Sequence, residues 1–130
     1  MARAIAGGIF YFLLVFGAGF LLGTVRILVL APRVGETAAV LIELPAMLAI
    51  SWVACGFILR RLDVPAAPAE RLAMGAVAFA LLIAAEAMLA VAFGETPAQF
   101  LHSLQSAPGA LGLAGQIAFA VFPLARRARI

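Results

Sequence analysis

The chain has 130 residues, of which 66% are hydrophobic and only 12% are charged, whereas a soluble domain is about half apolar and about a quarter charged. A chain this short has too little interior to hide so much apolar surface from water, so its solvent is partly lipid. Although the pI is 10.5, the basic residues are all arginines scattered at segment ends, without a basic patch and interleaved aromatic residues. This pattern argues against nucleic-acid binding.

Four apolar runs follow one another along the chain, each close to the roughly 20 residues with which a helix crosses about 30 Å of hydrocarbon. Because the runs are continuous rather than alternating, and because lipid cannot hydrogen-bond to the backbone, we expect helices. The predicted fold is therefore all-α: a polytopic membrane protein that forms a single domain over residues 1–130. The predicted transmembrane helices span about Ile5–Leu30, Ala38–Leu59, Leu72–Phe93 and Pro108–Ala125.

The connectors between these runs carry turn chemistry. In Ala31–Thr37, the first connector, Pro32 and Gly35 act as breakers. The third connector, Gly94–Gly109, is longer and contains Thr96-Pro97-Ala98-Gln99, which is typical of an N-cap, a proline at the first helical position and a capping-box glutamine. We therefore expect a short amphipathic helix in the membrane interface, between the third and fourth spans. Its apolar side would carry Phe100, Leu101 and Leu104.

The distribution of arginines predicts the orientation, since cytoplasmic segments carry the excess of positive charge. Seven arginines fall on one side of the predicted spans, and the connectors on the other side offer only Arg33. We therefore expect a protein of the bacterial inner membrane with both termini in the cytoplasm. The first run is too long for a signal peptide and three more spans follow, so we interpret it as the first helix. The seven arginines are Arg3, Arg60, Arg61, Arg71, Arg126, Arg127 and Arg129.

Three ionisable residues lie within the predicted spans: Arg26, Glu43 and Glu86. At about 1.5 Å per residue, they lie roughly 6, 8 and 10 Å from the nearest ends of their helices. The predicted orientation puts all three in the outer third of the bilayer, at similar heights on neighbouring helices. Charged residues at such depth are costly in lipid, so they indicate either a structural pair or a functional polar site.

The sequence suggests how these charges are accommodated. Pro45 cannot donate to the carbonyl of Leu41, which frees that carbonyl and kinks the helix. Arg26 has five donors, so we expect it to pair with Glu43 and to reach the freed carbonyl as well. Glu86 is then the excess negative charge and the better candidate for function. The alternative is that the charges reach the headgroups, and that one Arg–Glu pair only fixes the register of the hairpin.

Other features indicate packing rather than chemistry. Gly19 and Gly23 form a GxxxG pattern, which favours close helix packing within the chain or in a homo-oligomer. Gln116 is predicted to hydrogen-bond across the bundle in a structural role. His102, the only histidine, belongs to the interfacial helix, which excludes a bis-histidine haem within one chain. One cysteine, Cys55, excludes an intrachain disulfide and a zinc site built on paired cysteines.

No catalytic triad, phosphate-binding loop or metal-ligand spacing is present in the sequence. We therefore expect no enzymatic activity, no metal and no cofactor.

The segment from Gly23 to Trp52 resembles a group of small four-helix membrane proteins predicted from proteobacterial genomes. Those proteins share a G-T-x-R, a P-R-x-G-E and an E-x-P in the same order. The resemblance covers the first hairpin well and the rest only in layout, so it implies the fold and no activity. The matching residues here are Gly23-Thr24-Val25-Arg26, Pro32-Arg33-Val34-Gly35-Glu36 and Glu43-Leu44-Pro45.

Three functions agree with these patterns. The first is a non-enzymatic accessory or structural partner of a larger membrane complex, which would have membrane lipids and a membrane protein or a second copy as partners. The second is a small proton- or ion-coupled transporter that uses Glu86 and Glu43. The third is a binder of a lipid or quinone head group, whose anion would contact Arg26 and Arg33.

Overall fold

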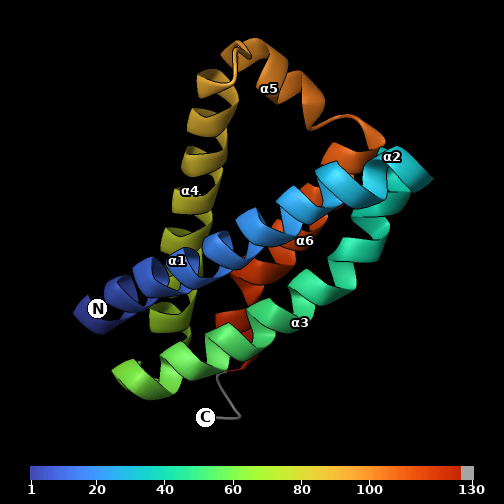
Figure 1. Cartoon of the computed structure of the whole chain (residues 1–130). Coiled ribbons are helices and arrows are strands. Elements are labelled where there is room, and N and C mark those ends of the chain that lie inside the picture. Colours follow the sequence, from blue (N-terminus) through green and yellow to red (C-terminus); the bar gives the residue numbers. More distant parts are fainter. Residues whose placement is uncertain (127–130) are drawn as a thin grey trace.

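The computed structural model describes residues 1–126, and every regular element in that range is a helix (Figure 1). The predicted all-α fold is therefore confirmed. Arg127 and Arg129, which contribute to the predicted orientation, lie outside the described residues. In chain order the elements are α1 (Ala2–Val25), a π-helical turn η1 (Arg26–Leu30), α2 (Ala31–Val34), α3 (Glu36–Leu62), α4 (Pro68–Ala92), α5 (Pro97–Ser103) and α6 (Ala107–Ala125).

Three helical segments in the described range are long and apolar enough to cross a membrane: Ala2–Val34, Glu36–Leu62 and Pro68–Ala92. The first is 33 residues long, and only 6% of its most apolar window is buried within the protein. Its length of about 50 Å exceeds the hydrocarbon thickness, so a membrane crossing by this segment would require a tilt. Gly109–Ala125 is also apolar but shorter, so length alone does not establish the fourth predicted span.

The structure corrects the predicted boundaries of the spans. The first helix does not end at Leu30, because η1 and α2 continue it through Pro32 to Val34. The chain leaves the helix only at Gly35, whose φ of 87° favours glycine. The later helices begin before the apolar runs do, since Glu36 and Pro68 are themselves helical.

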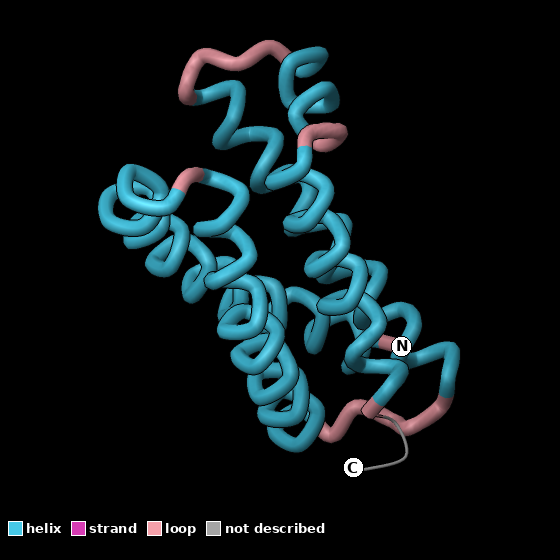
Figure 2. The backbone as a smooth tube through the Cα atoms, turned by 90° about the vertical axis from the view of Figure 1, so that its right-hand side faces the viewer, coloured by secondary structure: helices cyan, strands magenta, loops and turns pink. Residues whose placement is uncertain are grey.

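The four long helices form a ring in which α1 and α6 each pack against both α3 and α4. Figures 1 and 2 show that the helices converge at one end of the molecule. Towards the other end, α4 diverges from α1 and α3, and α5 bridges the gap from the end of α4 to the start of α6. The short helix predicted before the last run is thus present as α5, and it begins with the predicted Thr96–Gln99 capping box.

The converging end is closed by polar contacts. Arg71 is fully buried and donates to the carbonyl oxygens of Val64, Pro65 and Pro123 at 3.5, 3.1 and 3.1 Å. These bonds tie the α3–α4 connector to the last turn of α6, whose carbonyls lack helical partners. The N-terminal amine of Met1 also pairs with Glu70 at 2.9 Å. The start of α1, the start of α4 and the end of α6 therefore meet at the same end.

Close helix approach occurs at glycines other than the predicted GxxxG pair. A side chain at Gly75 on α4 would meet the backbone of Ala120 on α6, and one at Gly8 on α1 would lie 2.7 Å from the carbonyl oxygen of Met74. At Gly23, in contrast, the nearest atom belongs to Arg26, 3.8 Å away and on the same helical segment. A side chain at Gly19 would lie 3.4 Å from Cε of Met47 on α3, so within the chain Gly19 faces another helix and Gly23 does not.

We expect Gly75→Ala to destabilise the protein, because the added methyl group would force α4 and α6 apart. Overpacking of this kind costs about 1–3 kcal/mol. Gly17→Ala is the matched control, since nothing lies within 4 Å of a side chain built there and alanine is the better helix former. Thermal unfolding in detergent measures both variants. A Gly75→Ala protein as stable as Gly17→Ala would contradict the assigned contact.

Candidate functional site: a polar cleft

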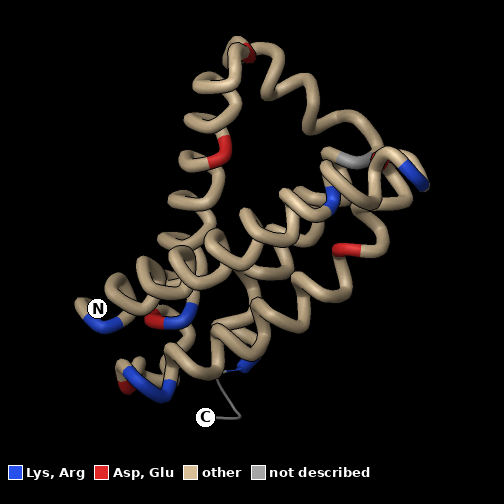
Figure 3. The backbone as a smooth tube through the Cα atoms, viewed as in Figure 1, with Lys and Arg blue, Asp and Glu red and all other residues tan. Residues whose placement is uncertain are grey.

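A cleft of about 640 Å³ lies at the diverging end, between α4 on one side and α1, η1 and α3 on the other, with α5 and α6 completing its wall. We call it the polar cleft. The charged residues predicted within the spans, Arg26, Glu43 and Glu86, all line it. Figure 3 shows few charged positions on the long helices between their ends, so these residues stand out in an apolar scaffold. Further polar lining comes from Glu36, Glu95 and Gln116.

Arg26 and Glu43 form an ion pair across the first hairpin, as the sequence predicts. The Glu43 side chain is only 10% exposed and that of Arg26 is 28% exposed, so water screens the pair weakly. Arg26 is the first residue of η1, and its carbonyl accepts from the N–H of Ala31, five residues on. A single π-helical turn of this kind is rare and frequently occurs at functional sites.

The hydrogen bond predicted from Arg26 to the backbone carbonyl of Leu41 is not found. Among the described residues, the guanidinium of Arg26 donates to Glu43 and makes no hydrogen bond to the carbonyl of Leu41. Leu41 is 51% exposed and does not line the cleft, whereas Glu43 does, so the two residues face different directions. The helix continues through Pro45, and Figure 1 shows α3 changing direction in this region.

Glu86 has a partner on the opposite helix. The amide nitrogen of Gln116 on α6 donates to Oε2 of Glu86 on α4 at 2.5 Å. The amide oxygen of Gln116 is buried and has no partner in the part of the chain that the structure describes. Among the described residues, the hydrogen-bond partner of the Glu86 carboxyl group is therefore a neutral amide. The cross-bundle bond predicted for Gln116 is present, but its acceptor is the site residue itself.

A stacked aromatic pair closes the cleft at its inner limit. The hydroxyl of Tyr11 on α1 donates to the carbonyl oxygen of Phe119 on α6 at 2.7 Å, and their rings stack with centroids 4.2 Å apart. Tyr11 is fully buried, while Phe119 lines the cleft beside Val15 and Leu82. Beyond this floor lies the packed core with Cys55 and Met74. The sequence gives no signal for this floor, because it joins residues 108 positions apart.

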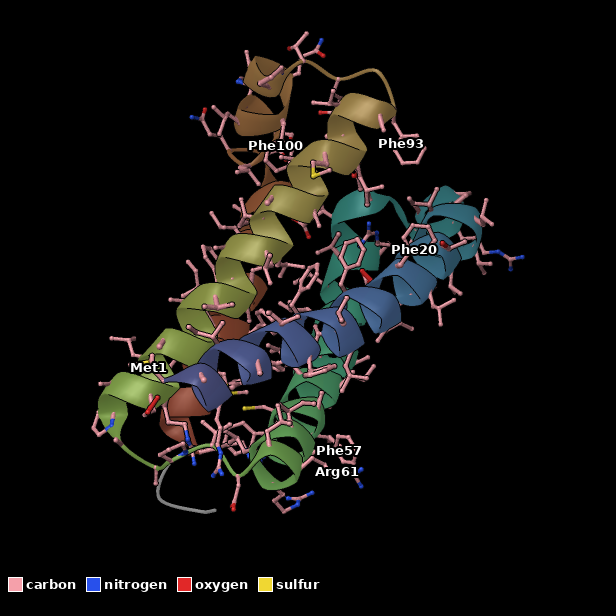
Figure 4. The ribbon with its side chains drawn as sticks, turned by 90° about the vertical axis from the view of Figure 1, so that its left-hand side faces the viewer. Met1, Phe20, Phe57, Arg61, Phe93 and Phe100 are labelled. Carbon is pink, nitrogen blue, oxygen red and sulfur yellow. The ribbon has the colours of Figure 1, made fainter. Side chains whose placement is uncertain are left out.

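The helix α5 forms the outer edge of the cleft. Its capping box, with Thr96 and Gln99 bonded at 2.8 and 3.1 Å, fixes where the helix begins. As a result, Phe100 and Leu104 line the cleft, whereas Leu101 is 63% exposed. The prediction that these residues share one side is therefore wrong for Leu101. Figure 4 shows Phe100 and Phe93 on the elements that frame this edge.

Arg33, a candidate anion contact, and His102, the only histidine of the sequence, lie outside the cleft. Arg33 is exposed at the end of α2, and His102 is exposed on α5, and neither lines the cleft. Arg33 therefore does not join Arg26 in the polar cleft, and the anion contact predicted for it stays a prediction. Among residues 1–126, no group of His, Cys, Asp and Glu side chains has an arrangement that would hold a metal ion.

No family model, no curated protein and no solved structure matches this chain. The resemblance of the first hairpin to small proteobacterial membrane proteins therefore stays a prediction. The geometry of the site is that of a carboxyl group, Glu86, hydrogen-bonded to the amide of Gln116. It lies opposite the Arg26–Glu43 ion pair in a cleft that ends inside the protein.

We expect the Arg26–Glu43 pair to contribute measurably to stability. Removing one partner of a buried pair costs about 3–5 kcal/mol, and partial exposure of Arg26 lowers the expectation for Arg26→Gln to about 2 kcal/mol. The double variant Arg26→Gln/Glu43→Gln should be more stable than the sum of the single losses predicts, because no charge is then left alone. Unfolding in mixed detergent micelles measures the cycle. Strictly additive losses would contradict the pairing.

Proposed function

We propose that the protein is a small, non-enzymatic integral membrane protein that takes up and releases a proton or small cation at Glu86, as a proton- or ion-coupled carrier. The observation that supports this most is the position of Glu86: it lines a cleft within the helix ring and is held by a neutral amide rather than by a cation. Ionisable residues inside membrane segments are characteristic of ion pathways and proton relays.

We further propose that all four long helices span the bilayer of a bacterial inner membrane. The helix α6 has 19 residues, a length of about 28 Å, which is close to the hydrocarbon thickness. It packs between α3 and α4 in the same ring, so it shares their surroundings. Four spans place Met1 and the end of α6 on the same side, in keeping with the contacts at the converging end. The arginines at this end favour a cytoplasmic location.

The charge balance of the cleft favours a cationic ligand over an anionic one. Four carboxylates line it, from Glu36, Glu43, Glu86 and Glu95, against the single guanidinium of Arg26. That guanidinium already binds Glu43. An anionic lipid or quinone head group would meet excess negative charge, which makes the head-group binder the weakest of the three functions. A proton or cation would instead reduce that excess.

Gln116 is suited to a carboxyl group that changes its protonation state. With Glu86 ionised, the amide NH₂ donates to the carboxylate, which is the arrangement observed. With Glu86 protonated, a rotation of the amide would let its buried oxygen accept the carboxyl O–H. The pair thus keeps one hydrogen bond in both states, so neither state leaves Glu86 without a partner.

The cleft also has the asymmetry that a carrier requires. It reaches Glu86 from the α5 end, and the Tyr11–Phe119 contact closes it from the other end. Transport would need a second state in which this floor opens and the α5 end closes. An accessory subunit, the first expectation from the sequence, needs no such cleft, and for this reason we favour the carrier.

The proposal predicts that Glu86 exchanges a proton with the solution. Infrared difference spectra of the protein in lipid, recorded between acidic and alkaline pH, should contain the carbonyl band of a protonated buried carboxyl group. We expect Glu86→Gln to remove this band. Asp63→Asn is the matched control, because Asp63 is exposed outside the cleft at a left-handed position that asparagine also tolerates.

Two results would contradict the proposal. One is a wild-type protein without a titrating carboxyl band, and the other is a band that persists in Glu86→Gln.

A further inference from the structure

We propose that the ligand carried by this cleft is a lipophilic organic cation, meaning a positively charged group on an apolar, aromatic body. This inference rests on the proposed function and names the class of molecule whose charge Glu86 would neutralise. The cleft volume of about 640 Å³ lies within the roughly 300–1,000 Å³ of known small-molecule sites. A proton or a metal ion alone would not need that space.

The wall of the cleft is aromatic as well as acidic. Besides the carboxylates, five phenylalanines line it: Phe16, Phe20, Phe93, Phe100 and Phe119. Phe20 is 54% exposed and Phe93 is 80% exposed, so neither ring is packed in the core, and both can contact a ligand. Figure 4 shows Phe93 at the end of α4 and Phe20 on α1, on either side of the gap between these helices. Aromatic faces attract cations, most strongly where water is excluded.

The acidic groups are placed to receive one positive charge. Glu43 forms an ion pair with Arg26, whereas Glu86 accepts a hydrogen bond from the amide of Gln116. The oxygen of that amide is a further buried acceptor beside Glu86 and has no partner within residues 1–126. A cation between α4 and α6 would therefore find a carboxylate and an amide oxygen together, with phenylalanine rings around its apolar body.

The ion pair opposite Glu86 makes the site selective for charge sign. Arg26 alone would repel a cation, but Glu43 cancels its charge at the contact itself. Glu36 and Glu95 then add negative charge to the lining without a cation beside them in the same cleft. A ligand of the same shape with a negative charge would meet only repulsion from these carboxylates, so the cleft distinguishes cations from anions.

Binding of tetraphenylphosphonium tests this inference, with tetraphenylborate as the control that matches it in size and shape but carries the opposite charge. Equilibrium binding is measured with the full chain in lipid nanodiscs, after subtraction of empty nanodiscs. We expect saturable binding of tetraphenylphosphonium and none of tetraphenylborate. Glu86→Gln should weaken phosphonium binding about tenfold or more, and Phe93→Leu should weaken it severalfold. Asp63→Asn should bind like the wild type.

The inference is overturned if the two probes bind alike, if neither saturates, or if Glu86→Gln binds phosphonium as tightly as the wild type. Phe93→Leu provides a second test in case the Glu86→Gln protein does not fold. Phe93 is largely exposed, so its replacement leaves the core intact. The infrared titration separates this inference from the proposed function. A titrating Glu86 without phosphonium binding rejects only the ligand class, whereas a Glu86 that does not titrate rejects proton exchange itself.

Discussion

The ion pair between Arg26 and Glu43 is the constraint on which the rest of the site depends. A guanidinium within so apolar a helical segment needs a partner, and Glu43 supplies one across the hairpin. The pair fixes η1 against α3 and thereby sets one wall of the polar cleft. Among the described residues that line the cleft, Arg26 carries the one positive charge, and its pairing with Glu43 leaves the carboxyl group of Glu86 without a cationic partner.

The opposite wall follows from how the helices diverge. Gly75 lets α4 approach α6 closely near the converging end, and Arg71 ties that end together. Further along, α4 diverges from α1 and α3 (Figure 1), so Glu86 reaches a cleft instead of a packed core. The Tyr11–Phe119 contact marks where the packing becomes continuous. A tight end and an open end within one ring of helices give the molecule the sidedness that a carrier requires.

The sequence predicts the helices and the ion pair well because both depend on local spacing. Apolar runs predict helices to within a few residues, and Arg26 and Glu43 are level across a single turn. It does not predict the partner of Glu86, since a lone glutamine in an apolar run gives no sign of which helix it faces. The bond expected from Arg26 to the carbonyl of Leu41 is not formed, and the guanidinium donates to Glu43 instead. The three-carbonyl contact of Arg71 and the Tyr11–Phe119 floor join distant segments, and no sequence pattern encodes them.

Access of water to Glu86 is the most direct test of this account. In a Cys55→Ala background, which removes the only cysteine of the sequence, a cysteine is placed at position 86 or at position 84, an exposed alanine two residues away that does not line the cleft. Both proteins are treated in membranes with a charged, membrane-impermeant thiol reagent. The account predicts rapid labelling of Glu86→Cys from one side of the membrane only and no labelling of Ala84→Cys. Equal protection of both positions would contradict it.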